Sequence, residues 1–298
     1  MILQRLRHAL ARPWRSAAAA PARQDAEGSP PAHALPPLPA DADPARLAPE
    51  TIVPFRCNLC GAPNAVALAA LHRERPSCTR CGSNVRFRAM AHLLVTELLG
   101  PPAVLEELAP HPGITGIGLS DDASYAQPLA RCFGYENTWF HTEPQLDIAN
   151  VAPELAGRYD FLVASDVFEH VVPPVGRAFA NARMLLKPGG AFVFSVPFSL
   201  ADDTVEHFPE LFDFRVGEED GLWRLRTVTA DGRAQVFDDL VFHGGPGTTL
   251  EMRLFSRAAL LREFTAAGFA SVRVAAEPYL PFGIVWPEPW SVPMVARA

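Results

Sequence analysis

Two short apolar runs joined by a helical pattern most constrain the fold of this chain. Residues 159–165 (YDFLVAS) and 190–196 (GAFVFSV) are strand-like and almost wholly apolar. Between them, residues 175–186 place Val, Ala, Phe and Leu side chains on one helical face, and Pro188 ends that helix. Strands that are apolar on both faces occur in parallel sheets covered by helices on each side. The sequence therefore predicts an α/β protein with a doubly wound, mostly parallel sheet.

Other segments extend this alternation. Strand-like runs predict further strands at residues 103–108, 114–119, 137–142, 269–274 and 291–298. Apolar residues at helical spacing predict further helices over residues 84–99, 120–133 and 256–267. Ser256 is the expected cap at the start of the last helix, and Gly268 ends it.

Residues 1–50 differ from the rest of the chain. Ala and Pro dominate them, and such a stretch cannot bury enough apolar surface to offset its ordering entropy, so a disordered tail is predicted. Residues 1–15 carry leucines on one helical face among arginines, which leaves a contact with a membrane surface open as the alternative. From residue 51 the pattern is globular, with a small module over 51–100 and a larger domain over 101–298.

The charge balance and the cysteines limit the partners and the compartment. Lys+Arg number 26 against 33 Asp+Glu, for a formal net charge of -7. A nucleic-acid partner calls for a basic patch, so none is expected. No apolar run approaches the ~20 residues needed to span a bilayer. Cysteines in close pairs favour a reducing compartment, so we predict a cytoplasmic protein.

Four of the cysteines form two C-x-x-C pairs, namely Cys57, Cys60, Cys78 and Cys81. A C-x-x-C turn brings two thiolates to one cation, and two such turns complete a tetrahedral shell. The pattern predicts a structural zinc site in a small knuckle or ribbon, closed by four ligands and without a catalytic role. Two chance pairs of buried thiols, or a redox dithiol, are the alternatives. Cys132 is predicted to be a buried core thiol.

Residues 159–198, YDFLVASDVFEHVVPPVGRAFANARMLLKPGGAFVFSVPF, resemble the centre of a class I S-adenosylmethionine-dependent methyltransferase. In that family an acidic turn like SDVFEHV follows one strand, and LKPGG leads into the next. The resemblance extends more loosely over the domain after residue 100, and the CxxCG pattern resembles a zinc-bearing subgroup. It implies a Rossmann-like seven-stranded sheet and S-adenosylmethionine as cofactor.

The resemblance also implies where the cofactor binds. In the family a glycine-rich loop follows the first strand, but Gly116 lies too few residues before Asp160 for that position. GIGLSDD (116–122) is therefore interpreted as the second strand and its turn, and residues 103–113 as the first strand and loop. The implied cofactor-binding residues are Gly113, Gly116, Ser120, Asp121, Glu143, Asp147 and Asp166. For the acidic residues in this set, the alternative is a solvent-exposed side chain at the end of a strand, without a role in cofactor binding.

The acceptor side is expected just past residues 159–165 and in an insertion over about 198–250. His170 and His207 are the candidate catalytic bases, with structural roles as the alternative. The implied reaction is methyl transfer to a small-molecule or sugar acceptor. One alternative is a non-catalytic methyltransferase-like protein that binds through the zinc module and the insertion. Another is a recruitment protein with an exposed basic ribbon, formed by Arg73, Arg75, Arg80, Arg86 and Arg88.

Overall fold

The computed structural model describes Leu38 and residues 42–298. Residues 1–15, with their alternative of a membrane-surface contact, and most of the predicted tail over 1–50 lie outside the described residues. Within the part that is described, no helix is both long and apolar enough to cross a membrane.

A mixed six-stranded sheet forms the centre of the molecule, in the order β15-β16-β6-β5-β3-β4. Its strands are β3 (His111–Leu119), β4 (Phe133–Thr138), β5 (Tyr159–Ser165), β6 (Leu186–Ser195), β15 (Ser271–Val274) and β16 (Met294–Arg297). The first four are parallel, whereas β16 runs antiparallel to both β6 and β15. The predicted α/β sheet is confirmed, with six strands among the described residues instead of the seven that were expected.

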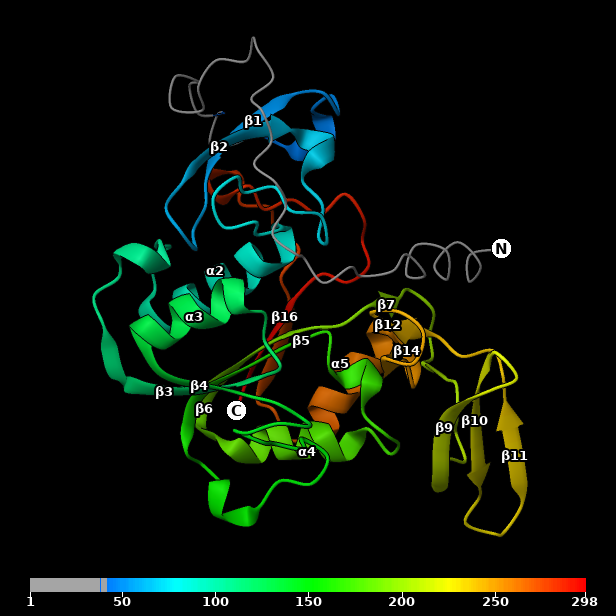
Figure 1. Cartoon of the computed structure of the whole chain (residues 1–298). Helices are drawn as coiled ribbons and strands as arrows, with labels where there is room; N and C mark the ends of the chain where they lie inside the picture. Colours follow the sequence, from blue (N-terminus) through cyan, green and yellow to red (C-terminus); the bar gives the residue numbers. More distant parts are fainter. Residues whose placement is uncertain (1–37, 39–41) are drawn as a thin grey trace.

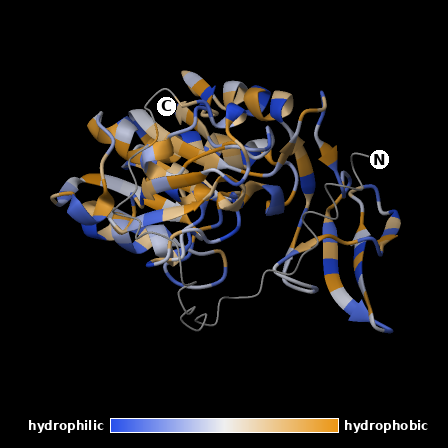
Figure 2. Cartoon of the chain, turned by 90° about the horizontal axis from the view of Figure 1, so that it is seen from above, coloured by the Kyte–Doolittle hydropathy of each residue, from blue (hydrophilic) through white to orange (hydrophobic). Residues whose placement is uncertain are grey.

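Helices cover both faces of this sheet (Figure 1). On one face lie α2 (Val85–Leu99) and α3 (Ala123–Cys132), and on the other lie α4 (Gly176–Leu185) and α5 (Arg257–Ala266). Side-chain caps begin three of them: Asn84 accepts from Phe87 N, Asp122 from Ser124 N, and Ser256 from Ala259 N. Figure 2 shows the hydrophobic residues gathered in the central layer, where each face of the sheet has its own core.

The interpretation of residues 114–119 as the second strand is wrong. They belong to β3, which lies between β4 and β5, the position of a first strand in a doubly wound sheet. The spacing to β5 is short because residues 139–158 contain no α-helix and no full strand. A parallel bridge between Trp139 and Gln145 marks where a third strand would continue the sheet. The predicted strand over 137–142 accordingly ends at Thr138.

Residues 103–108 do not form a strand either. They contain a 3-10 helix, η4 (Leu105–Glu107), whose backbone is held from two sides. Leu105 N donates to the Asn58 carbonyl, and the buried Cys132 thiol donates to the Leu105 carbonyl. Cys132 is thus a core thiol, as predicted.

The glycines of β3 serve packing. A Cβ at Gly116 would lie 2.0 Å from the Phe161 ring, and one at Gly118 would lie 1.9 Å from the Tyr135 hydroxyl. Gly113 lies at the amino end of β3, about 20 Å of extended chain before Leu119. Ligands bind at the carboxyl ends of such strands, so the prediction that Gly113 forms a cofactor loop is wrong.

The N-terminal module packs directly on the sheet. It holds η2 (Pro44–Arg46), β1 (Ile52–Arg56), β2 (Pro63–Ala67) and η3 (Leu68–Ala70). Apolar residues of the module share one core with α2, α3 and the sheet. The C-terminal segment with η7 (Leu280–Phe282) packs against the module. Gly283 lies so close to the Phe55 ring that a Cβ at this position would be 2.6 Å from it. Module and sheet therefore form one structural unit.

The predicted insertion over about 198–250, together with the segment up to α5, is made of short strands. They are β7 (Phe198–Ser199), β8 (Val205–Glu206), β9 (Asp213–Glu219), β10 (Leu222–Val228), β11 (Ala234–Phe237), β12 (Phe242–His243), β13 (Thr249–Leu250) and β14 (Arg253–Ser256). The antiparallel sheet β11-β10-β9 projects from one side of the molecule (Figure 1). A small separate core around Phe208 and Leu225 supports it. The remaining 3-10 turns are η5 (Pro153–Leu155) and η6 (Phe168–His170).

Candidate active site and cysteine cluster

Four cysteine thiols converge between the β1–β2 turn and the loop before α2. Cys57 Sγ lies 3.7 Å from Cys81 Sγ, and Cys60 Sγ lies 3.6 Å from Cys78 Sγ. Two thiolates bound to one tetrahedral zinc ion, with Zn–S bonds of about 2.3 Å, lie about 3.8 Å apart. The predicted convergence of the two C-x-x-C turns is confirmed, and its spacing suits a zinc ion.

The surroundings of the cysteines suit thiolates. After each pair a glycine at φ +71 closes a turn, with Gly61 N donating to the Cys57 carbonyl and Gly82 N to the Cys78 carbonyl. Arg88 lies fully buried beside the cluster and donates only to carbonyl and hydroxyl oxygens. No carboxylate of the described part pairs with this guanidinium, so its positive charge is available to balance a thiolate cluster.

A ligand crevice is expected where the strand order of an open α/β sheet reverses. Here β3 leads to β4 on one side and β5 leads to β6 on the other, so the crevice lies at the carboxyl ends of β3 and β5. Ser120 follows β3 and Asp166 follows β5, with φ of 55 and 56. Such backbone angles are uncommon outside glycine and cluster at functional sites. Two of the predicted cofactor-binding residues thus lie at this edge of the sheet.

Two arginines of the N-terminal module reach this edge. Arg73 Nη2 lies 3.0 Å from Asp166 Oδ1, and Arg86 Nη1 lies 3.2 Å from Asp166 Oδ2. Glu74 pairs with both guanidinium groups. Burial acts to raise the pKa of Asp166, but the two guanidinium groups outweigh it and lower that pKa to about 2. The carboxylate therefore stays ionised at neutral pH.

Sequence reasoning missed this role for Arg73 and Arg86. The alternative of an exposed basic ribbon is not supported, because Arg73 and Arg86 are only 7% exposed and Arg88 is fully buried. A signal was present in the sequence: Arg86 and Arg88 alternate with apolar residues in the first two turns of α2, which are otherwise apolar. A charged side chain is rarely buried unless polar groups satisfy it, so these arginines indicate contacts with polar groups inside the fold.

Asp121 is 1% exposed and faces the protein interior. The hydroxyl groups of Tyr125 and Tyr135 donate to its two carboxylate oxygens, at 2.5 and 2.6 Å. Burial raises the pKa of Asp121 to about 7, although the two hydrogen bonds act in the opposite direction. Because both oxygens are occupied, the expectation that Asp121 binds the cofactor is not met by this geometry.

Replacing Asp121 with asparagine should change how stability depends on pH. The folded pKa of about 7 lies above the ordinary value of 3.8, so the folded state holds the extra proton between these values. The contribution of Asp121 to the free energy of unfolding is therefore full below about pH 4 and is lost as pH rises to about 7. The free energy of unfolding of Asp121→Asn, relative to that of wild type, should therefore rise by a few kcal/mol between pH 4 and pH 8.

Urea unfolding of both proteins at several pH values measures this change. Glu143→Gln, at an exposed carboxylate, is the control and should show no comparable trend. A difference between Asp121→Asn and wild type that stays constant with pH would mean that Asp121 titrates normally.

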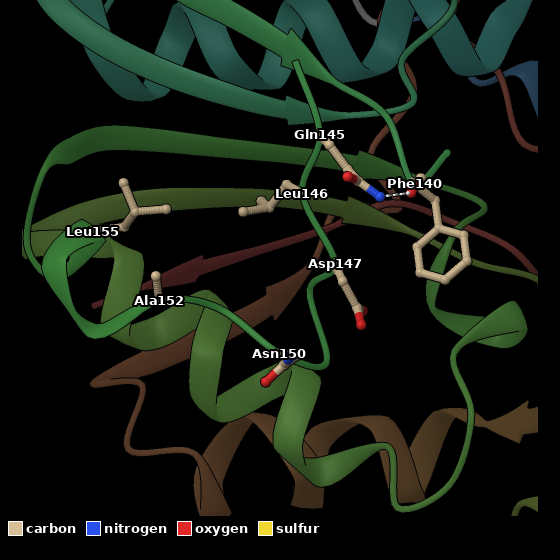
Figure 3. A pocket seen from close by; sticks show the side chains of 7 residues that line it. All are labelled: Phe140, Gln145, Leu146, Asp147, Asn150, Ala152 and Leu155. Carbon is tan, nitrogen blue, oxygen red and sulfur yellow. Dashed lines mark hydrogen bonds between the residues drawn. The ribbon is translucent and has the colours of Figure 1, made fainter. Parts of the chain in front are cut away.

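The remaining two predicted cofactor residues follow β4. Asp147 lines a surface depression of about 480 Å³, together with Phe140, Gln145, Leu146, Asn150, Ala152 and Leu155 (Figure 3). Gln145 Nε2 donates to the Phe140 carbonyl across its rim. Asp147 Oδ1 accepts from Ala149 N, while Glu143 lies exposed in the preceding turn and accepts from Gln145 N. Both carboxylates are within reach of solvent or a ligand.

Histidines and glutamates gather on the other side of Asp166. His207 Nε2 lies 2.8 Å from Glu251 Oε1, and His243 Nε2 lies 2.9 Å from Glu251 Oε2. The His170 ring packs edge-on against His243, with ring centroids 4.6 Å apart. The structure thus brings His170 and His207 into one cluster, and it adds His243 and Glu251 from the insertion.

Burial and mutual charges set the titration of this cluster. Burial raises the pKa of Glu169 to about 8 and lowers that of His170 to about 4. Burial acts to raise the pKa of Glu251, but hydrogen bonds from His207 and His243 outweigh it and lower that pKa to about 2. At neutral pH His170 is therefore a neutral imidazole, able to accept a proton or a cation.

Fold and site together define a Rossmann-like α/β protein with polar and charged side chains gathered at the carboxyl ends of its central strands. The family model described as a methyltransferase domain matches residues 100–274, more than half of the chain. The chain belongs to this methyltransferase family and is an S-adenosylmethionine-dependent methyltransferase, as predicted. The match covers five of the six strands of the central sheet and the insertion.

Solved structures with a similar fold are also methyltransferases. One is the 1,6-didemethyltoxoflavin-N1-methyltransferase of Burkholderia thailandensis, with 16% identity, a TM-score of 0.36, and coverage of 70% of this chain and 77% of that one. Another is CalS10, an amino pentose methyltransferase from Micromonospora echinaspora, with 14% identity, a TM-score of 0.38, and coverage of 71% and 89%. No curated protein matches the chain. At these identities and scores the structures add no argument to the family match.

Proposed function

We propose that this methyltransferase acts on a small-molecule or sugar acceptor, bound between the crevice and the insertion. The observation that carries the proposal is the buried cluster of histidines and glutamates at the carboxyl end of β5, to which the insertion contributes His207, His243 and Glu251. A hydroxyl or amine acceptor benefits from such groups, which accept or redirect a proton. The formal charge of -7 disfavours a nucleic-acid acceptor.

Incubating the full chain with methyl-labelled S-adenosylmethionine and a panel of acceptors tests this proposal. Hydroxylated and aminated small molecules and free sugars are expected to take up label. RNA, DNA and unfolded protein are not. Label transferred only to a macromolecule would overturn the proposed acceptor class.

S-Adenosylmethionine supplies an activated methyl group on a sulfonium. Arg73 and Arg86 suit its amino-acid carboxylate, because the Nε atom of each buried guanidinium has no hydrogen-bond partner in the described structure. Ser120 and Asp166 are our candidates for polar contacts at the crevice, with Glu143 and Asp147 for the adenosine portion. His170 and His207 remain our candidates for activating the acceptor.

Replacing Arg73 with alanine should weaken binding of S-adenosylmethionine by about tenfold or more, because a charge-assisted contact is lost. Arg75→Ala, two residues away on the exposed side of the same loop, is the matched control and should bind normally. Calorimetric titration of both variants gives the two dissociation constants. Equal constants would remove Arg73 from the cofactor site.

We also propose that the four cysteines hold a structural zinc ion. The distances between sulfur atoms and the buried Arg88 beside them support this assignment. Because Arg73 lies five residues before the second cysteine pair and Arg86 five residues after it, in the first turn of α2, the zinc ion would fix the segment that brings both guanidinium groups to the crevice.

A further inference from the structure

Glu169 is a buried carboxylate without any hydrogen-bond partner. It lies in η6, directly after β5, and is 1% exposed. Neither of its carboxylate oxygens has a partner in the described structure. An unpaired buried carboxylate costs several kcal/mol when charged, and a protonated one still needs an acceptor for its proton. Either a proton shared with a neighbouring imidazole or a bound ion must therefore satisfy this side chain.

The hydrogen bonds of two neighbouring histidines fix where their protons lie. His170 Nδ1 is 2.9 Å from the Leu250 carbonyl oxygen, which only accepts, so Nδ1 carries the proton. His243 Nε2 is 2.9 Å from Glu251 Oε2, an ionised carboxylate oxygen, so Nε2 carries the proton. In the neutral rings His170 Nε2 and His243 Nδ1 therefore bear lone pairs.

These two lone pairs face the unpaired carboxylate. Glu169 Oε1 lies 3.7 Å from His170 Nε2 and 3.9 Å from His243 Nδ1. With Glu169 ionised and both rings neutral, three acceptor atoms thus converge, an arrangement that repels itself unless a proton or a metal cation lies between them. Two ligands with bonds of about 2.1 Å to a tetrahedral ion lie about 3.4 Å apart, so a small contraction would complete the coordination.

We propose that Glu169, His170 and His243 bind a divalent metal cation, separate from the cysteine cluster. Their ligand atoms lie within 4.8 Å of one another. The outer contacts are those of a metal site, in which each ligating imidazole donates its other N–H to a carbonyl or carboxylate. Here the Leu250 carbonyl and Glu251 fill these roles, and His207 in turn donates to Glu251.

The types and number of the ligands indicate which metal ions can bind and what chemistry they can perform. Two imidazoles and one carboxylate suit zinc and other first-row divalent ions, and three protein ligands leave a coordination position open. The site lies three residues beyond Asp166, on the side of the insertion. Given the proposed function, the open position would take an acceptor hydroxyl and lower its pKa, which narrows the acceptor class to hydroxylated compounds.

Equilibrium dialysis of the full chain against Zn²⁺, followed by metal analysis, tests the site. Wild type is expected to hold a second zinc ion beyond the one at the cysteines. Glu169→Gln and His243→Ala should each lose the second ion, and Glu251→Gln should bind it about 10- to 100-fold more weakly. His141→Ala, at an exposed histidine outside the cluster, should keep both ions.

Cobalt provides a second readout on wild type, which needs no variant to fold. Co²⁺ added to protein that carries one equivalent of zinc, held at the cysteines, should give visible bands without sulfur charge transfer. No ion beyond the cysteine site in wild type, or equal zinc contents in all variants, would overturn the proposal and leave an imidazolium or a water molecule as the partner of Glu169. These readouts count metal, so they stand apart from any failure of the proposed methyl transfer.

Discussion

Replacing Cys57 with serine should abolish zinc binding at the cysteine cluster and unfold the N-terminal module. Metal binding at such sites contributes on the order of 10 kcal/mol to folding in small zinc domains. The core of the module is continuous with that of the sheet, so the loss of the metal weakens both. We therefore expect a large drop in the thermal midpoint, together with loss of S-adenosylmethionine binding, because Arg73 and Arg86 lose their support.

Cys132→Ser is the matched control for this prediction. Cys132 is also a buried thiol, but it donates to the Leu105 carbonyl and lies outside the cluster. It should keep the zinc content of wild type and lose only modest stability. A Cys57→Ser protein that is metal-free and yet unfolds at the wild-type temperature would show that the cluster is a set of plain core thiols.

Replacing Asp166 with asparagine should have the second-largest effect. The side chain is the shared partner of Arg73 and Arg86, which are both buried. Removing one member of a buried ion-pair network costs about 3–5 kcal/mol, since the remaining charge is left uncompensated. The loss should be measurable by urea unfolding at pH 7, and cofactor binding should fall with it.

The pH dependence supplies a further check on Asp166. Its folded pKa of about 2 lies below the ordinary value of 3.8, so its contribution is present above about pH 4 and disappears as pH falls towards 2. The destabilisation by Asp166→Asn should shrink over that window. Asp160→Asn is the control, because Asp160 pairs with the half-exposed Lys187 and should cost about 1 kcal/mol or less. Equal effects of the two substitutions at pH 7 would contradict the account of the crevice.

Periodicity predicted the fold well where elements bury one continuous face. The helix at 84–99, the strand at 159–165 and the final antiparallel strand follow directly from apolar patterns, and the structure confirms them. The assignment of residues 114–119 failed because it depended on counting residues to β5. That count assumes a complete third strand and its helix, and this chain has only a bridge between Trp139 and Gln145.

The candidate site was only partly predictable, for a related reason. Cys57 and its partners carry their own spacing signal, and Asp166 and His170 follow a recognisable strand. Arg73 and His243 come from loops far away in sequence, and no local pattern states that a loop folds back onto the carboxyl end of β5. Contacts between distant segments depend on the tertiary packing of the module and the insertion, which periodicity does not encode.

Binding of the cofactor tests the central claim most directly. Calorimetric titration of the zinc-loaded full chain with S-adenosylmethionine and with S-adenosylhomocysteine should give saturable binding at one site per chain, weakened by Arg73→Ala but not by Arg75→Ala. Absence of binding of either ligand at millimolar concentration would contradict the account, and would favour a methyltransferase-like protein that binds through its module and insertion without catalysis.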